Sequence, residues 1–167
     1  GSIGYLRVPA LTQQLVSEAS KALPQLLSTR YLILDLRNVA SGGIEPMVQL
    51  GQWLLGSASI VGFVSREGGM ALPYREEAVA AYGVGEMLAY VLNTYKRGRL
   101  VGTKTQGGFH LGQDVELPSG GSLHLTVGLY VGPQNEIMPI NGLEPDNTVE
   151  IPDLETVRSG RDVYIEA

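Results

Sequence analysis

Two glycine-rich turns and one charged strand end are the parts of this sequence that could hold a reacting group. An apolar stretch ends in Leu-Asp-Leu-Arg-Asn at residues 34–38, and Ser-Gly-Gly follows at 41–43. A buried strand that ends in charged residues and then glycines presents backbone N–H groups at the carboxyl edge of a sheet, where they can hold a developing oxyanion. Gly42, Gly43 and Arg37 are therefore candidate oxyanion- or peptide-binding residues, although two glycines also make an ordinary strand-to-helix turn.

The second turn, Gly-Thr-Lys-Thr-Gln-Gly-Gly-Phe at residues 102–109, follows a short apolar stretch. Its backbone N–H groups could cradle a phosphate, with help from Lys104. However, it lacks the Gly-Lys-Ser/Thr ending of a Walker loop, and a hairpin pattern follows it instead of a long helix. A loop that another backbone segment approaches closely is favoured over a phosphate site. Residues 142–146 (Gly-Leu-Glu-Pro-Asp) form a third turn, which by itself indicates only a turn.

Composition excludes several classes of function. With 167 residues, 44% of them hydrophobic and 17% charged, the chain suits one domain with a hydrophobic core. No apolar run reaches the ~18–20 residues of a membrane span. The net charge is −5 and the basic residues do not cluster, so nucleic-acid binding is not expected. Cysteine is absent, and His110 and His124 form no His-x-x-x-His pair, so neither a metal site nor a cofactor is expected.

The hydrophobic pattern predicts strands alternating with helices. Thr12 or the residue before it is expected to cap the first helix, Pro24 to break or kink it near its end, and Gly98 to cap the third helix. Residues 31–36 are nearly all apolar, which is typical of a strand covered on both faces. The strand–turn–helix–strand order favours a parallel sheet with covering helices. Strands are predicted at 3–8, 31–36, 60–64 and from 100, helices at 12–27, 46–55 and 76–96, a hairpin at 113–131, and a last short strand after 142–146.

Taken in order, these segments resemble the tail-specific, or C-terminal processing, serine peptidases. The tricorn core and the retinoid-binding modules of the photoreceptor matrix are similar to the same group. The resemblance covers most of residues 3–151, and its most specific parts are Asp-Leu-Arg-Asn…Gly-Gly at 35–43 and Gly-x-x-Pro-Asp at 142–146. It implies an α/β fold with a crotonase/Clp-protease-like β-β-α core, a parallel-type sheet, covering helices and a C-terminal β-hairpin.

The resemblance breaks at the two residues that would carry the chemistry. Family members place the nucleophilic serine three residues before the acid that opens a helix; that acid is Glu86 here, and the position is Gly83. In the lysine-using branch the base lies about twenty-five residues further on, which is Gly108. Glycine offers neither an oxygen nor a proton to such a reaction. No serine lies between Ser65 and Ser119, so a local shift of register does not restore one.

Other side chains could replace the missing groups. The tricorn-like branch lacks the lysine and takes its histidine from sequence that precedes this core. Lys104 and His110 are weak candidates for a local base, and His110 also suits a solvated hairpin position. The hydroxyls of Thr103 and Thr105 lie in the turn at residues 102–109, called the base loop below, and not at the nucleophile position.

The segment before Gly83 also departs from the family. Members run an apolar strand directly into the serine, whereas residues 73–82 have a helical composition here. Residues 66–86 are therefore either rebuilt or incomplete.

The resemblance implies three kinds of function. The first is a proteolytically inactive peptidase-family domain, a pseudoenzyme, that keeps a cleft for a peptide or a protein C-terminus; a carrier of a small apolar ligand such as a retinoid or fatty acid is a variant of it. The second is an active serine endopeptidase whose nucleophile or base is altered or missing here. The third is an acyl-CoA enzyme of crotonase type, against which the Asp-Leu-Arg-Asn and Pro-Asp elements count.

The domain organisation follows from the Gly-Ser start of the sequence and from the same resemblance. Residues 1–2 are expected to be a tag remnant, 3–151 the core and 152–167 a C-terminal tail. A PDZ domain usually precedes this core in complete members, and none is present in this sequence. The family suggests an extracytoplasmic location, in the periplasm or a plastid lumen, and the oligomeric state is left open.

Overall fold

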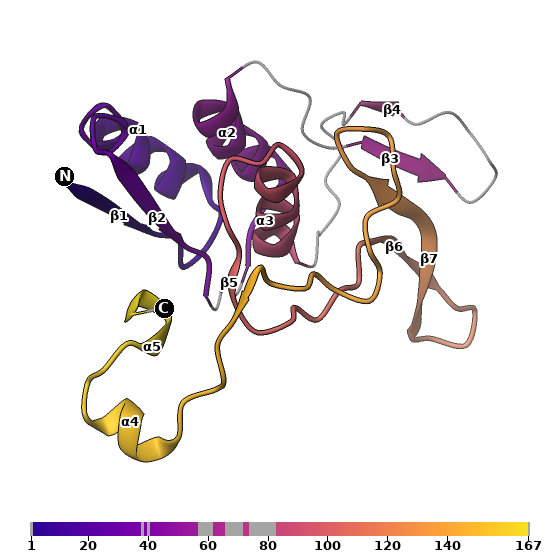
Figure 1. Cartoon of the computed structure of the whole chain (residues 1–167). Helices are drawn as coiled ribbons and strands as arrows, with labels where there is room; N and C mark the ends of the chain where they lie inside the picture. Colours follow the sequence, from indigo (N-terminus) through magenta and orange to yellow (C-terminus); the bar gives the residue numbers. More distant parts are fainter. Residues whose placement is uncertain are drawn as a thin grey trace.

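The computed structural model describes residues 2–37, 39, 41–56, 62–65, 72–73 and 83–166, and Figure 1 shows their arrangement. The strands and helices follow one another along the chain as the α/β prediction expected. The elements are β1 (Ile3–Arg7), α1 (Gln13–Leu27), β2 (Tyr31–Asp35), α2 (Ile44–Leu55), β3 (Gly62–Ser65), β4 (Leu72–Pro73), α3 (Val84–Thr94), β5 (Val101–Gly102), β6 (His110–Glu116), β7 (Ser122–Val131), β8 (Asn147–Thr148), α4 (Leu154–Arg158) and α5 (Val163–Glu166).

The first layer is the parallel pair β1 and β2, with α1 connecting them. As predicted, Thr12 caps α1: its side chain accepts the Leu15 N–H at 3.2 Å. Pro24 lies inside α1 and does not end it, because the helix continues to Leu27.

The prediction that 31–36 is covered on both faces is wrong, since Tyr31 is 59% exposed. Among the described residues, α1 packs on one face of the pair and leaves the other face open.

Pairing in the larger sheet differs from the parallel expectation. Four strands are hydrogen-bonded in the order β4-β3-β7-β6, all antiparallel. The predicted strand at 60–64 is β3, shifted toward its C-terminal side, and residues 60–61 lie outside the described part. Among the described strands, parallel pairing occurs in β1–β2 and in the short pair β5–β8, and outside the strands Leu11 and Gly42 form an isolated parallel bridge. The α/β class is confirmed, with parallel and antiparallel strands divided among three small sheets.

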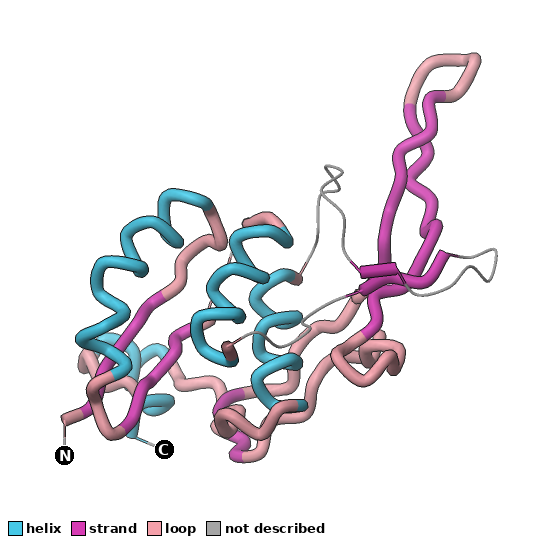
Figure 2. Tube along the Cα trace, turned by 90° about the horizontal axis from the view of Figure 1, so that it is seen from above, coloured by secondary structure: helices cyan, strands magenta, loops and turns pink. Residues whose placement is uncertain are grey.

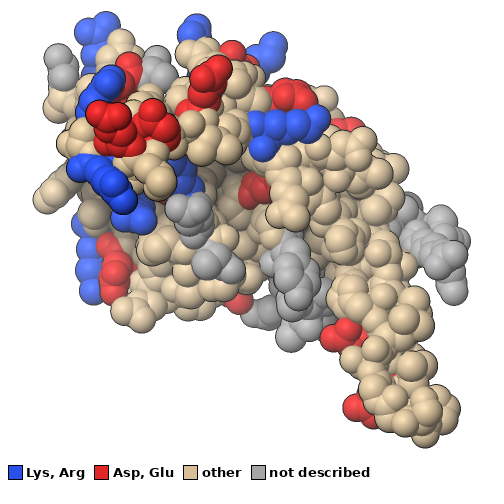
Figure 3. Space-filling view, turned by 90° about the horizontal axis from the view of Figure 1, so that it is seen from below, with Lys and Arg blue, Asp and Glu red and all other residues tan. Residues whose placement is uncertain are grey.

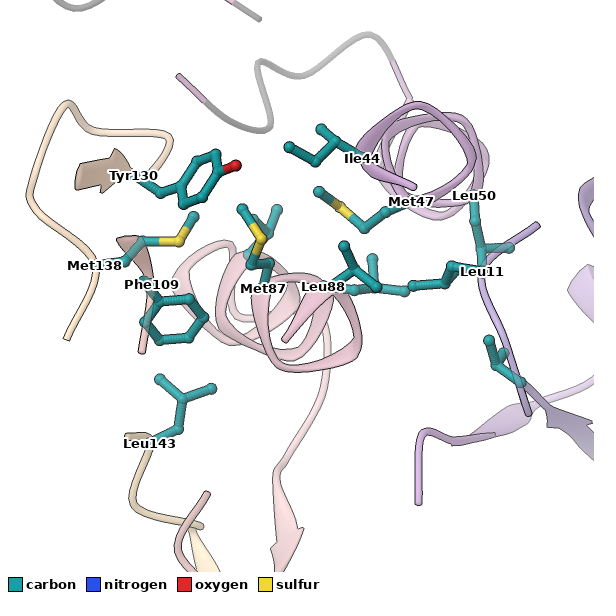
Figure 4. Packing of buried hydrophobic residues seen from close by; sticks show 13 residues of the cluster. Leu11, Ile44, Met47, Leu50, Met87, Leu88, Phe109, Tyr130, Met138 and Leu143 are labelled. Atoms are coloured by element: carbon teal, nitrogen blue, oxygen red, sulfur yellow. The ribbon is translucent and has the colours of Figure 1, made fainter. Parts of the chain in front are cut away.

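Helix α3 lies at the centre of the hydrophobic core. Met87 faces Phe109 and Met138 on one side of the helix, and Leu88 faces Leu11 and α2 on the other (Figure 4). These side chains are fully buried. The helix predicted at 76–96 is described only from Val84, and residues 76–82 lie outside the described part. Because α3 is held on both sides, its first residues are fixed relative to α2.

The end of α3 corrects the predicted Gly98 cap. The left-handed residue is Lys96, with φ 53°, and it follows the last helical turn directly. The Lys96 N–H donates to Asn93 O at 2.8 Å and the Arg97 N–H to Leu92 O at 2.9 Å. This is the Schellman arrangement, with lysine at the position that glycine usually takes. The sequence favoured Gly98 by residue type, whereas the hydrogen bonds end the helix two residues earlier.

Strands β6 and β7 form the predicted hairpin, which projects from the rest of the chain (Figure 2). Its outer half is exposed on both strands. The N-terminal end of β6 and the C-terminal end of β7 return to the core, where Phe109 and Tyr130 are buried. No helix among the described residues is long and apolar enough to cross a membrane.

Candidate functional site

Gly83 stands directly before α3 in a left-handed conformation, with φ 81° and ψ 23°. Its carbonyl accepts the Met87 N–H at 2.9 Å, which starts the helix. A Cβ built here would lie 3.4 Å from Glu86 Oε2, an ordinary contact. Space for a small side chain therefore exists, and the cost of one is backbone strain of about 1–2 kcal/mol. A sharp turn that opens a helix is also how hydrolases expose a nucleophile.

The Gly42–Gly43 turn lies against this helix start. A Cβ at Gly42 would lie 2.6 Å from Leu11 Cβ and 2.9 Å from Val84 Cγ2, so only glycine fits between them. Gly85 is in similarly close contact with Val39, at 2.8 Å from a built Cβ to Cγ2. The two sequence segments predicted to form one site are thus packed together.

The backbone N–H groups at this junction differ in availability. The Gly43 N–H donates to Leu11 O at 2.9 Å, and the Leu11 N–H donates to Ser41 O at 3.0 Å. Gly43 is therefore not a free donor, contrary to its candidate role. In this parallel bridge the N–H of Gly42 is directed away from Leu11. The first N–H groups of α3 have no partner within the helix, and Val84, its first residue, packs against Gly42. Together these donors suit an oxyanion or a peptide carbonyl.

The base loop is tied to α3 through Glu86. The Thr105 hydroxyl donates to Glu86 Oε1, and the Gly107 N–H donates to the same oxygen at 2.9 Å. The Thr105 hydroxyl also accepts the Leu143 N–H at 2.7 Å. A carboxylate in the first turn of a helix is further stabilised by the helix dipole. The acid that defined the register in the sequence therefore holds the loop in place.

The turn at 142–146, which by itself indicated only a turn, is the other support of the base loop. The Thr105 N–H donates to Leu143 O at 3.0 Å, and the Gly108 N–H donates to Ile140 O at 3.0 Å. Asp146 accepts the Leu100 N–H at 2.7 Å, which fixes the strand leading into the loop. Sequence reasoning missed these contacts because they join segments about forty residues apart; the paired glycines at 107 and 142 were the available signal.

The weak base candidates lie in different surroundings. Gly108, with φ 94°, has His110 beside it: a built Cβ would be 3.8 Å from Nδ1 of that ring. Lys104 instead contacts Glu144 Oε1 at 2.6 Å, and its side chain is half-exposed. The structure thus brings His110, and not Lys104, next to Gly108, the base position that the resemblance implies.

Arg37 is already engaged. It contacts Asp35 and, from the tail, Asp162, and its guanidinium lies 5.3 Å from the centre of the Tyr164 ring. Hydrogen bonds from Arg37 hold the pKa of Asp35 well below its usual range and also lower the pKa of Asp162. Any ligand of Arg37 would have to displace the Asp162 carboxylate.

The described residues also bear on a metal ion and on an apolar ligand. No group of three His, Asp or Glu side chains could hold a metal ion there. An open cavity of about 500 Å³ lies at the far end of α3, lined by polar and charged residues. Its lining is unlike that of an apolar carrier. It is formed by Asn93, Lys96, Arg97, Gly98, Arg99 and Asp146.

The chain is similar to known peptidases over most of its length. The model of peptidase family S41 matches residues 2–149. A carboxyl-terminal-processing protease of Synechocystis sp. is 31% identical over 165 residues, which cover 90% of this chain and 39% of that protein. The chloroplastic carboxyl-terminal-processing peptidase 3 of Arabidopsis thaliana is 28% identical, over 86% of this chain and 31% of that protein. The chain therefore spans less than half the length of these relatives.

Solved structures share the fold. The photosystem II D1 C-terminal processing protease superposes with a TM-score of 0.71 at 24% identity, covering 97% of this chain and 47% of that one. A putative peptidase from Parabacteroides merdae gives 0.75 at 19% identity, covering 98% of this chain and 59% of that one.

Proposed function

Because the chain belongs to peptidase family S41, we propose that it is a peptidase-family domain that binds peptide segments without hydrolysing them. The observation that carries this proposal is Gly83, which stands at the start of α3 with the surrounding frame in place. Covalent hydrolysis needs a hydroxyl or thiol that a base can deprotonate, and glycine has neither. Losing a nucleophile lowers the rate by orders of magnitude and leaves only oxyanion stabilisation and binding.

The binding part of the proposal uses the backbone donors that remain. Gly42 packs against Val84, the first residue of α3, and a peptide carbonyl or C-terminal carboxylate is the chemistry that the Gly42 N–H and the first N–H groups of α3 would fit. The core at 3–151 provides this frame, with 152–167 as a separate tail. A protein C-terminus as partner is in keeping with the processing proteases that the chain resembles.

One observation favours the second candidate, an active serine endopeptidase in altered form. His110 lies beside Gly108, where the family base would begin, so a base could act from a different position. A base alone has nothing to activate at Gly83, and this candidate therefore needs a hydroxyl from elsewhere. The same experiment distinguishes the two candidates.

The test is labelling with a fluorophosphonate probe, which reacts with activated serines. We expect no labelling of the unmodified chain or of Gly83→Ala, and labelling of Gly83→Ser combined with Gly108→Lys. Gly83→Ala is the matched control, because it adds the same backbone strain without a hydroxyl. Gly83→Ser alone reports whether His110 can serve as base. Labelling of the unmodified chain contradicts the proposal.

Binding is measured separately, by fluorescence anisotropy of a labelled peptide with a free C-terminus and of its C-terminally amidated form. We expect Gly42→Ala to weaken binding at least tenfold, because its Cβ would overlap Leu11 and Val84. Gly43→Ala is the control, since its Cβ would approach only Pro46, at 3.1 Å. If neither peptide binds the unmodified chain, the binding half of the proposal is wrong.

A further inference from the structure

The tail is attached to the body of the protein by Arg37. Nη1 of Arg37 donates to Asp162 Oδ1 and Nη2 to Asp162 Oδ2, both at 2.8 Å. Two parallel bonds of this kind are the strongest and most directional pairing of arginine with a carboxylate. The Tyr164 ring stacks near the same guanidinium, 5.3 Å from its centre to Cζ, so one arginine holds two residues of the tail.

Arg37 is positioned by groups other than the tail. Asp35, which is buried, accepts Arg37 Nε at 2.9 Å and Nη2 at 2.7 Å. Asp35 is itself fixed by the Tyr5 hydroxyl at 2.5 Å and by the Arg37 N–H at 3.0 Å. The guanidinium is therefore held in one orientation by β1 and β2, with one edge left for a second carboxylate.

Little else fixes the tail in place. Helices α4 and α5 have five and four residues and no buried residue. Helices this short are not stable by themselves in water. Figure 1 shows α5 beneath the β1–β2 pair, and Figure 3 shows that the surface seen from that side carries intermixed acidic and basic side chains. Polar contacts, and not a hydrophobic core, hold this segment, so its attachment is readily reversible.

The Tyr164 ring lies next to the strand that leads into the base loop. A Cβ built at Gly102 would lie 4.0 Å from Tyr164 Cε1, so the ring lies close to β5. Gly102 leads directly into residues 103–108. Arg37 and Gly102 thus form a surface for a carboxylate followed two residues later by an aromatic ring.

We propose that Arg37 and Gly102 form a recognition site for peptides containing an acidic residue, any residue and an aromatic residue in succession, and that residues 161–166 are its intramolecular occupant. The acidic side chain takes the free edge of the guanidinium, and the ring lies between Arg37 and β5. A peptide with the same spacing displaces the tail when it binds. This inference goes beyond the proposed function and does not depend on Gly83, because an active peptidase could carry the same site.

The test uses the full chain and a fluorescein-labelled peptide of the tail sequence Arg-Asp-Val-Tyr-Ile-Glu. The double variant Asp162→Asn, Tyr164→Ala empties the site, and the peptide should bind it at least tenfold more tightly than the unmodified chain. The tethered tail competes in the unmodified chain at an effective concentration on the order of millimolar. A peptide with Asn in place of Asp should lose at least tenfold in affinity for the double variant. Arg161→Gln is the control, because Arg161 pairs with Glu166 and not with Arg37.

Equal binding to the unmodified chain and the double variant, or equal binding of the Asp and Asn peptides, overturns the proposal. A second measurement needs no variant. The Tyr164 N–H donates to Asp162 at 3.2 Å, so its hydrogen exchange in the unmodified chain should accelerate when the peptide displaces the tail. Unchanged exchange at saturating peptide also overturns it. Fluorophosphonate labelling of the Gly83 variants tests the proposed function separately. The proposed function and the Arg37 recognition site can therefore each fail without the other.

Discussion

Gly83 forms a left-handed turn directly before α3, at the position that the family resemblance implies for the nucleophile. The left-handed turn, the helix that follows it and the carboxylate of Glu86 are all present. A non-glycine residue there would cost about 1–2 kcal/mol of strain, which reacting enzymes tolerate because the turn exposes the side chain. Glycine adopts the same turn at little cost.

Two neighbouring glycines of the base loop should respond very differently to alanine. Gly107 and Gly108 both have positive φ, 82° and 94°. A Cβ at Gly107 would overlap the carbonyl of Ile140 and lie 2.5 Å from the Gly142 N, whereas one at Gly108 makes ordinary contact with His110. We expect Gly107→Ala to lower the free energy of unfolding by about 3 kcal/mol or more, and Gly108→Ala by about 1 kcal/mol. Urea unfolding of both variants measures this, and equal losses would contradict the close approach of the two turns.

By resemblance to the family, the sequence placed the nucleophile position at Gly83, three residues before Glu86, and the base position at Gly108; the roles of both positions stay predictions. What it could not show is which N–H groups are free. Gly43 looked as suitable as Gly42, but whether each N–H is available depends on the bridge to Leu11, which lies more than thirty residues earlier in the chain. Residue type predicts a turn, and long-range pairing decides which of its donors can bind a ligand.

On the scale of elements, Thr105 joins α3, the base loop and the 142–146 turn. Thr105→Val keeps the shape but leaves the Leu143 N–H and the Glu86 carboxylate without this partner. We expect a loss of about 1–3 kcal/mol in the free energy of unfolding. Thr103→Val is the matched control: it lies in the same loop, is exposed, and should change stability by less than about 0.5 kcal/mol. Similar losses for both would mean that the network does not hold the loop.

A substitution at the C-terminal end of α3 is expected to stabilise the folded chain. Lys96 adopts φ 53°, which costs a side chain about 1–2 kcal/mol, while glycine loses more conformational entropy on folding. Lys96→Gly should therefore raise the free energy of unfolding by about 0.5–1 kcal/mol. Thermal unfolding checks it, with Arg97→Gly as the control that should bring no gain. A gain from Arg97→Gly equal to that from Lys96→Gly would show that the left-handed residue is not the cause.

Helices and strands with a clear hydrophobic periodicity were predictable from the sequence. The elements that they pair or pack with were not. Helix α1 and its Thr12 cap, and the hairpin of β6 and β7, follow from local patterns. The antiparallel pairing of β3 with β7 is set by where the hairpin returns to the core, and no alternation within β3 encodes it.

For the whole molecule, the tail is the part least evident in the sequence. The division into a core at 3–151 and a tail at 152–167 stays a prediction, and the contact that attaches this segment joins Arg37 to a residue 125 positions away. An arginine near a strand end suggested a ligand, and the structure provides one from the same chain. The Arg37 site and the Gly83 turn are supported by connected segments, since Val39 follows Arg37 and contacts Gly85.

Attachment of the tail should depend on pH in the acid range. Arg37 lowers the pKa of Asp162 in the folded chain, so the stabilisation is fully present above the unfolded pKa of about 3.9 and is lost as the pH falls through the folded value. We expect the melting temperature of the unmodified chain to exceed that of Asp162→Asn at pH 6, and the two to converge between about pH 4 and pH 2. The difference at pH 6 should also shrink in 1 M salt, because Asp162 is partly exposed. A difference that stays constant from pH 6 to pH 2 would mean that the Asp162 charge does not hold the tail, and that Arg37 recognises the segment through Tyr164 alone.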